Sequence, residues 1–179
     1  MEWLEAFNPF AAYGNLRDFL ETGGWVLYVI MGATFVMWVL IVERYWFFRA
    51  TLPGLKTRTL DLWQARENRQ SWYAHKVRER MISELSVSAT DTLGLIKTLV
   101  AVAPMLGLLG TVTGMVEVFD VMALTGASNA RAMAAGVAKA TLPTMAGMVA
   151  SLSGLYFSAQ LERRAKHEVE GLADRLAVG

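Results

Sequence analysis

The 179-residue sequence contains no cysteine, so disulfide frameworks and thiolate metal sites are both excluded. Histidine is almost as scarce. His75 and His167 stand far apart in charged segments, where we expect each to be a solvated surface residue and not a ligand. The net charge of +1 gives no indication of nucleic-acid binding. We therefore predict no metal site, no catalytic residue, no cofactor and no nucleic-acid partner.

Charge is missing from three long stretches. Trp25–Val42 and Leu99–Val116 have 18 residues each and Ala140–Leu161 has 22, all without a charged side chain. About 20 apolar residues cross the hydrocarbon core of a bilayer as a helix. The alternative is a soluble bundle with three buried helices, which a domain of this size rarely needs. We predict an all-α integral membrane protein with three transmembrane helices.

Lysine and arginine are unevenly distributed around these three runs. One precedes the first run, ten lie between the first and second, two lie between the second and third, and four follow the third. Because basic segments stay in the cytoplasm, the sequence predicts a periplasmic amino terminus and long cytoplasmic helical extensions, whose basic residues can contact anionic membrane lipid. The predicted segments are a periplasmic amphipathic helix at 1–22, broken near Asn8-Pro9, transmembrane helices at 23–48, 98–120 and 132–160, a cytoplasmic helical segment at 49–97, a periplasmic loop at 121–131 and a cytoplasmic tail at 161–179.

The first run is preceded by acidic residues, Glu2 and Glu5, in place of a basic region, so we expect a membrane span and not a cleaved signal. The second and third runs are rich in small and hydroxyl residues. Small residues let helix backbones approach closely, and hydroxyls bond across helices, although a water-lined polar path would use the same residues. Both interpretations stay open: the candidates for helix packing are Pro104, Gly107, Gly110, Gly114 and Gly147, and the candidates for pore lining are Thr111, Thr141, Thr144 and Ser151.

Three charged residues, Glu117, Asp120 and Lys139, lie near the outer ends of these two runs. Charges at membrane depth are costly and usually paired. In an antiparallel hairpin that turns near Thr125–Gly126, Lys139 and Glu117 differ by four residues, or about 6 Å along the axis, which a lysine stem can span. We predict a Lys139–Glu117 pair near the outer pore mouth. The alternative is that Lys139 faces phosphate headgroups.

Acidic residues are absent from the second and third runs. A proton relay through a membrane normally needs a titratable group near the middle. If this chain takes part in proton movement, a partner must bring the carboxylate.

Two stretches resemble the ExbB/TolQ/MotA proton-channel family. APMLGLLGTVTGMVEVF, at 103–119, resembles the signature APLLGLLGTVxGM, and Gly136–Met148 is similar to the third-span signature G-I-A-x-A-L-x-x-T-x-x-G-L. The resemblance covers most of the chain and is strongest to small ExbB-type subunits of TonB energising systems in the bacterial inner membrane. It implies a homo-oligomer, a pentamer around a pair of single-span ExbD-type helices, with proton-motive force driving the inner pair and a TonB-type protein transmitting the work.

Residue by residue, the resemblance places the family's pore threonines on Thr111 and Thr144. The family's acidic residue near the pore entrance falls on Lys139, and Pro143 replaces the usual alanine. These departures bear on whether the coupling ion is a proton or sodium. A TolQ-like subunit for envelope maintenance would use the same mechanism with a different output, and a passive membrane scaffold is the other alternative. A MotA-type chain is disfavoured because it would have four spans and a larger cytoplasmic domain.

Overall fold

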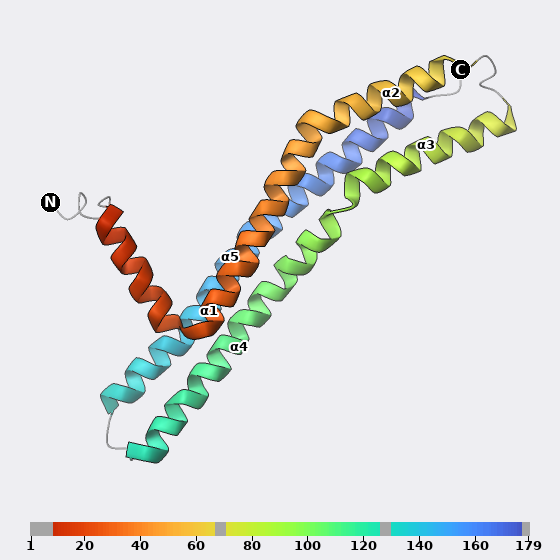
Figure 1. Ribbon diagram of the computed structural model, residues 1–179. Helices are drawn as coiled ribbons and strands as arrows, with labels where there is room; N and C mark the ends of the chain where they lie inside the picture. Colours follow the sequence, from red (N-terminus) through yellow and green to blue (C-terminus); the bar gives the residue numbers. More distant parts are fainter. Residues whose placement is uncertain (1–8, 67–70, 126–129, 177–179) are drawn as a thin grey trace. The chain divides into compact units, whose positions relative to one another are not determined.

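The computed structural model describes residues 9–66, 71–125 and 130–176, and this part of the chain is helical with no strand (Figure 1). The prediction of an all-α protein is confirmed for these residues. The elements are α1 (Pro9–Trp46), the π-helix η1 (Phe47–Thr51), α2 (Leu52–Gln64), α3 (Trp72–Thr90), α4 (Leu93–Thr125) and α5 (Ala130–Arg175).

The helices extend beyond the predicted spans. α4 begins five residues before the predicted second span and ends five residues after it, and α5 continues 15 residues past the predicted third span. The reason is that backbone hydrogen bonding continues from turn to turn regardless of the polarity of the side chains. Residues 1–8 of the predicted amino-terminal helix, with Asn8 of its predicted break, and residues 126–129 of the predicted loop lie outside the described residues.

Two helical stretches in the described residues, within Gly23–Gln64 and Trp72–Leu124, are long and apolar enough to cross a membrane. In each apolar window 28% of the residues are buried, whereas the core helix of a soluble domain would be mostly buried. Large side chains such as Phe35 and Met105 are 69% and 68% exposed. Such extended apolar surface requires lipid or other protein to cover it. The third predicted run, in α5, carries threonine, serine and glycine among its apolar residues, and its membrane crossing stays a prediction.

The chain divides into two compact units. We call Met1–Val36 with Leu99–Ser153 the apolar unit, and Met37–Thr98 with Gly154–Gly179 the charged unit. α1, α4 and α5 each contribute residues to both units.

In the apolar unit, α1 is kinked at Gly24, which has φ 69° and ψ −172°. Only glycine adopts this region readily, because a Cβ would clash with the backbone. The kink stands immediately before the first apolar run and produces the sharp bend within α1 in Figure 1. It separates the amino-terminal part of α1 from the part that could cross a membrane.

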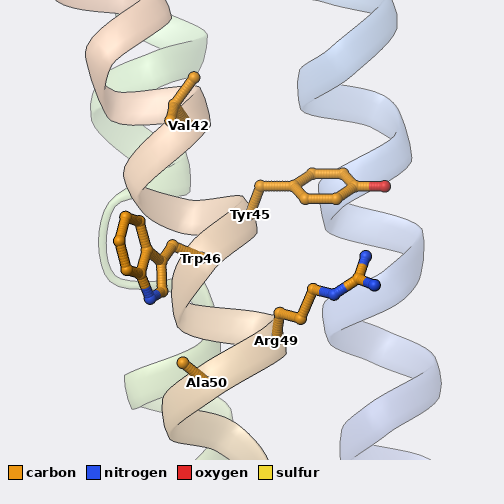
Figure 2. A pocket seen from close by; sticks show the side chains of 5 residues that line it. All are labelled: Val42, Tyr45, Trp46, Arg49 and Ala50. Carbon is orange, nitrogen blue, oxygen red and sulfur yellow. The ribbon is translucent and has the colours of Figure 1, made fainter.

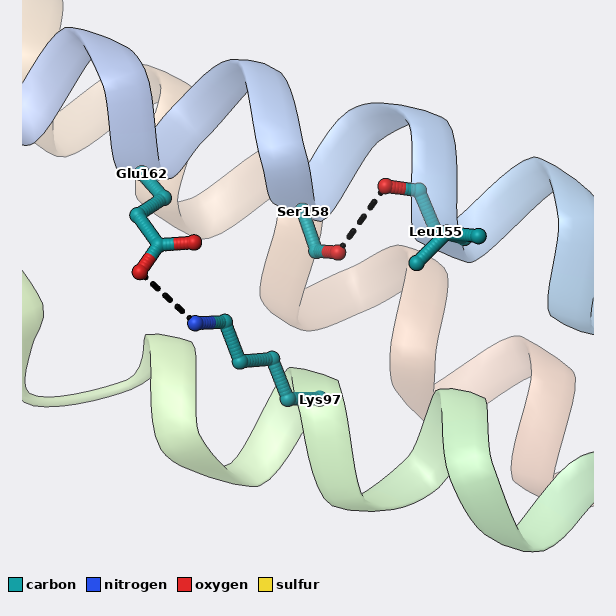
Figure 3. Close-up of polar contacts among 4 residues, drawn as sticks. All are labelled: Lys97, Leu155, Ser158 and Glu162. Carbon is teal, nitrogen blue, oxygen red and sulfur yellow. Dashed lines mark hydrogen bonds and ion pairs between the residues drawn. The ribbon is translucent and has the colours of Figure 1, made fainter.

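In the charged unit, long basic side chains connect the helices. Arg78 of α3 donates from Nε to the carbonyl of Leu176 and from Nη2 to that of Ala173, both at 2.8 Å. These carbonyls lie at the carboxyl end of α5, where no further turn of helix can bond them. Lys97 of α4 pairs with Glu162 of α5 at 2.8 Å (Figure 3).

Two further polar contacts involve α5. Lys56 of α2 forms an ion pair with Glu168, and the hydrogen bond from Lys56 lowers the pKa of the Glu168 carboxyl below its ordinary value. The buried hydroxyl of Ser158 donates to the carbonyl of Leu155 at 3.0 Å within its own turn (Figure 3). Ser158 is therefore satisfied without a partner from another helix.

Arg44, near the end of α1, is 3% exposed. Its Nη2 donates to the carbonyl of Ser88, and its guanidinium lies 4.6 Å from the ring centroid of Phe47 and 5.7 Å from that of Phe48. Its buried Nε has no hydrogen-bond partner in the described residues. The π-helix η1 follows directly, closed by a hydrogen bond from the N–H of Leu52 to the carbonyl of Phe47.

Candidate functional site

In the apolar unit, α4 and α5 are in backbone contact through glycine. A methyl group added to Gly107 would lie 2.9 Å from Cα of Thr144, and one added to Gly114 would lie 2.7 Å from Cβ of Ala140. A methyl group on Gly147 would lie 2.5 Å from the carbonyl oxygen of Ala103. Side chains of any size at these positions would force the helices apart.

These contacts form a ladder along the two helices, which we call the glycine ladder. Its pairs are Ala103 with Gly147, Gly107 with Thr144, Gly110 with Pro143, Gly114 with Ala140, and Val118 with Gly136. The residue numbers rise along α4 as they fall along α5, so the two helices are antiparallel. Four of the five predicted packing residues lie in the ladder, and the fifth, Pro104, is half-buried in α4.

In the α5 half of the ladder, sequence reasoning named Gly147 for packing and Thr144 for pore lining, and it did not name the other three residues as packing candidates. Gly136, Ala140 and Pro143 are small or compact residues spaced three or four apart, so they lie on one face of a helix. The packing candidates of α4 have the same spacing. Applying this criterion to both helices would have identified the partner residues.

Thr111 and Thr144 meet inside the ladder. Their hydroxyls hydrogen-bond to one another, and both lie close to the carbonyl oxygen of Gly107, with Oγ1 of Thr144 at 3.0 Å and Oγ1 of Thr111 at 3.4 Å. One of the two hydroxyls donates to the other, which leaves one proton for the carbonyl. Both threonines are half-buried. We call these three oxygens the hydroxyl cluster. The structure thus brings together the two threonines that the family resemblance singled out.

The hydroxyl cluster has more acceptors than donors. Each hydroxyl contributes one proton, and both protons can be used within the cluster. The remaining groups are lone pairs, which can accept a hydrogen bond from a protonated acid or coordinate a cation. Binding an ionised carboxylate would require one hydroxyl to give up an internal hydrogen bond.

The other candidate pore residues do not join this cluster. Thr141 is exposed, and its hydroxyl donates to the carbonyl of Ala138 at 2.8 Å in its own helix. Ser151 is half-buried further along α5. Whether Thr141 or Ser151 lines a pore stays a prediction. Thr113, two residues after Thr111, was not a candidate, and its hydroxyl donates to the carbonyl of Gly110 at 3.1 Å in its own helix.

The predicted ion pair is present: Nζ of Lys139 lies 2.7 Å from Oε2 of Glu117. The side chains are 36% and 56% exposed. The lysine stem passes Gly24 of α1: Cε of Lys139 lies 3.9 Å from the position that a Cβ on Gly24 would occupy. A cavity of about 10 Å³, close to the room that one water needs, lies beside this pair. It is lined by Gly23, Gly24, Trp25, Val26, Gly110, Thr113, Gly114, Glu117 and Lys139.

Comparison with known proteins identifies the family. A model of the MotA/TolQ/ExbB proton channel family matches residues 47–174, which is more than half of the chain. The chain belongs to the MotA/TolQ/ExbB proton channel family. The matched region includes both the hydroxyl cluster and the Lys139–Glu117 pair.

Individual members of the family are also similar to this chain over shorter stretches. A putative biopolymer transport protein ExbB-like 3 from Synechocystis is 38% identical over 66 residues, which are 36% of this chain and 31% of that protein. A putative ExbB-like 1 protein from the same organism is 39% identical over 64 residues, 34% of this chain and 25% of that protein. The biopolymer transport protein ExbB of Pseudomonas putida is 34% identical over 74 residues, 41% of this chain and 22% of that protein. The chain therefore spans less than a third of the length of these relatives.

Membership in this family, together with the two membrane-compatible helices, makes the chain a membrane protein of the proton channel class. The family is a channel and transport family, not an enzyme family. The hydroxyl cluster fits this chemistry because hydroxyl and carbonyl oxygens have lone pairs that can accept a proton donor or coordinate a cation.

Proposed function

We propose that this chain is an ExbB-like subunit of an ion-driven motor in the bacterial inner membrane. It would work with a single-span ExbD-type partner and couple proton-motive force, through a TonB-type protein, to transport across the outer membrane. Family membership and the biopolymer transport names of the relatives support this assignment. A TolQ-like output would use the same parts.

The hydroxyl cluster is the observation that carries the proposal. It joins two helices of the apolar unit, one of them long and apolar enough to cross a membrane, at a level where this chain has no acidic residue. The partner's carboxyl group would be the titrating group. In its protonated form it would donate a hydrogen bond to the free lone pairs of Thr111 or Thr144. On ionisation it would lose that bond and move, because the cluster offers no spare proton to an anion.

The proposed topology has three spans, with the amino terminus in the periplasm and the basic segment in the cytoplasm. The uneven distribution of lysine and arginine supports this orientation. The proposed assembly is a homo-oligomeric ring, a pentamer, around the partner helices. The exposed apolar side chains of α1 and α4 supply surface for contacts between copies and with lipid.

Thr111→Val and Thr144→Val test the proposal. Valine keeps the shape of threonine and removes the hydroxyl. With the partner co-expressed in membrane vesicles, we expect each variant to lower proton flux about tenfold, the effect of losing roughly one hydrogen bond to the moving group. The flux is measured with a pH-sensitive dye after a potential is imposed.

Thr113→Val is the matched control, because its hydroxyl bonds within its own turn of the same helix. It should leave the flux unchanged. Normal flux in both Thr111→Val and Thr144→Val, at normal abundance, would mean that the threonines serve packing alone and that the chain acts as a scaffold.

Native mass spectrometry of the detergent-solubilised protein tests the ring. We expect a single homo-oligomer of five copies that retains the partner when the two are co-expressed. A stable monomer would contradict the proposed assembly.

A further inference from the structure

An open groove of about 410 Å³ follows one face of the junction between α1 and η1. It begins within the last turns of the first apolar run and ends beside charged residues. Its walls are largely uncovered by the rest of the chain, with Trp46 72% and Val42 57% exposed. The lining residues recur every three or four positions and are Val42, Tyr45, Trp46, Arg49 and Ala50 (Figure 2).

One guanidinium lines this groove, that of Arg49, and a second, that of Arg164, lies beside the lining residue Tyr45. In Figure 2 the side chains of Tyr45 and Arg49 extend from the same side of the helix, towards α5. From α5, the guanidinium of Arg164 lies over the ring of Tyr45, 5.4 Å from its centroid. Positive charge is therefore concentrated along one edge of a groove whose other wall is the indole of Trp46.

Neither guanidinium has a carboxylate within 4 Å in the described residues. Glu168, whose pKa Arg164 helps to lower, is already hydrogen-bonded to Lys56. Arg44, the other arginine nearby, is buried and bonded to the carbonyl of Ser88. Arg49 and Arg164 are the cations left to bind an external anion.

We propose that this groove binds an anionic phospholipid. The acyl chain would lie along Val42 and Trp46, and the phosphate would lie between Arg49 and Arg164. A guanidinium presents a planar fork of N–H donors that matches phosphate oxygens, and tyrosine and tryptophan favour the headgroup level of a bilayer. One amphipathic molecule satisfies both walls, whereas free phosphate would leave the apolar wall uncovered.

Native mass spectrometry of the full-length, delipidated protein in detergent tests this site. The probes are phosphatidylglycerol, phosphatidylcholine with the same acyl chains, and inorganic phosphate. We expect phosphatidylglycerol to be retained in preference to phosphatidylcholine and not to be displaced by an equal concentration of phosphate. Arg49→Gln and Arg164→Gln should each weaken phosphatidylglycerol binding about fivefold, the effect of removing one cation at a membrane surface.

Arg163→Gln is the matched control, because Arg163 is an exposed arginine adjacent to Arg164 in sequence but on another part of the helix surface. It should leave phosphatidylglycerol binding within twofold of the unaltered protein. An equal loss in all three variants would show diffuse attraction and overturn the proposal, as would equal retention of the two lipids. Displacement by inorganic phosphate would overturn it in favour of a free-phosphate site.

Trp46→Ala should weaken retention of both lipids. If it dissociates the oligomer and leaves lipid retention unchanged, a second copy of the chain occupies the groove and the proposal is wrong.

Discussion

In the apolar unit, α4 and α5 touch through glycine and alanine, whereas in the charged unit α5 is connected to α2, α3 and α4 by lysine and arginine side chains that reach across. Of the six ion pairs found in the described residues, five lie in the charged unit. Helices in lipid gain little from burying apolar surface against each other, so close backbone contact has to hold them. In the proposed topology the residues that form the ion pairs of the charged unit lie outside lipid, where long solvated side chains can bridge helices. The two units should therefore respond to different perturbations: the first to side-chain size, the second to charge.

Side-chain size in the glycine ladder should have the largest effect. Gly147→Ala places a methyl group 2.5 Å from the carbonyl of Ala103 and 3.3 Å from Cα of Gly107, both of which are backbone atoms and cannot rotate away. We expect a loss of about 1–3 kcal/mol, the usual cost of overpacking. Thermal unfolding in detergent, followed by size-exclusion chromatography, measures it.

Gly32→Ala is the control for this variant, since Gly32 lies in α1 of the same unit with no atom within 4 Å of an added methyl group. It should be neutral or stabilising by up to about 1 kcal/mol, because alanine is the better helix former. Equal destabilisation by the two substitutions would mean that the ladder is not closely packed.

Arg78 should matter most in the charged unit. Arg78→Gln removes two hydrogen bonds to the last carbonyls of α5, and we expect a loss of about 2 kcal/mol. Arg80→Gln, which removes an exposed pair with Glu84 within α3, should leave stability nearly unchanged, because solvent screens a pair at the surface. If Arg80→Gln costs as much as Arg78→Gln, net charge and not the bonds to α5 would be responsible.

The Lys139–Glu117 pair tests whether charge also matters in the apolar unit. We expect Lys139→Met and Glu117→Gln each to destabilise, and the double variant to lose about 0.2–1 kcal/mol less than the sum, because the pair is partly exposed. Unfolding of the two single variants and the double variant in detergent gives this coupling. Strict additivity would show that the two side chains do not interact in the protein.

The smallest effect we predict is a pH dependence from Lys56 and Glu168. The pKa of Glu168 is lowered in the folded protein, so the pair stabilises the fold above the ordinary pKa of a glutamate and loses this contribution as the pH falls through the lowered value. Glu168→Gln should therefore narrow the difference in melting temperature between neutral and acidic pH. In a Lys56→Met background, Glu168→Gln should leave this difference in melting temperature unchanged. If Glu168→Gln also leaves it unchanged in the otherwise unaltered protein, the assignment is wrong.

The sequence was sufficient for features that depend on local pattern. Uncharged runs identified the apolar parts of α1 and α4, and helix geometry across a hairpin predicted the contact between Lys139 and Glu117. The family motif singled out Thr111 and Thr144, although their direct hydrogen bond was not predicted. That bond depends on how closely the two backbones approach, which the glycine ladder sets and which no single helix reveals.

Other features depend on tertiary contacts and were not predictable from the sequence. The burial of Arg44 contradicts the exposure that its charge alone indicates and results from the carbonyl of Ser88 and the rings of two phenylalanines. The two bonds from Arg78 to the end of α5 join residues 95 and 98 positions apart. The π-helix η1 cannot be recognised from residue composition, because it depends on which helix faces are buried before and after it in the chain.

The π-helix has a consequence for how this segment tolerates changes in length. Arg44, Phe48 and Leu52 are all buried, although residues four apart in an α-helix advance by about 40° and eight apart by about 80°. The wider turn of η1 cancels this rotation. It is equivalent to one extra residue in an α-helix, accommodated so that the residues of α2 keep their orientation. Deleting Thr51 should therefore restore an ordinary α-helix in which Arg44, Phe48 and the leucine still face the same way. The same deletion in the middle of α2 would rotate the rest of that helix by about 100° and remove its buried face from its contacts.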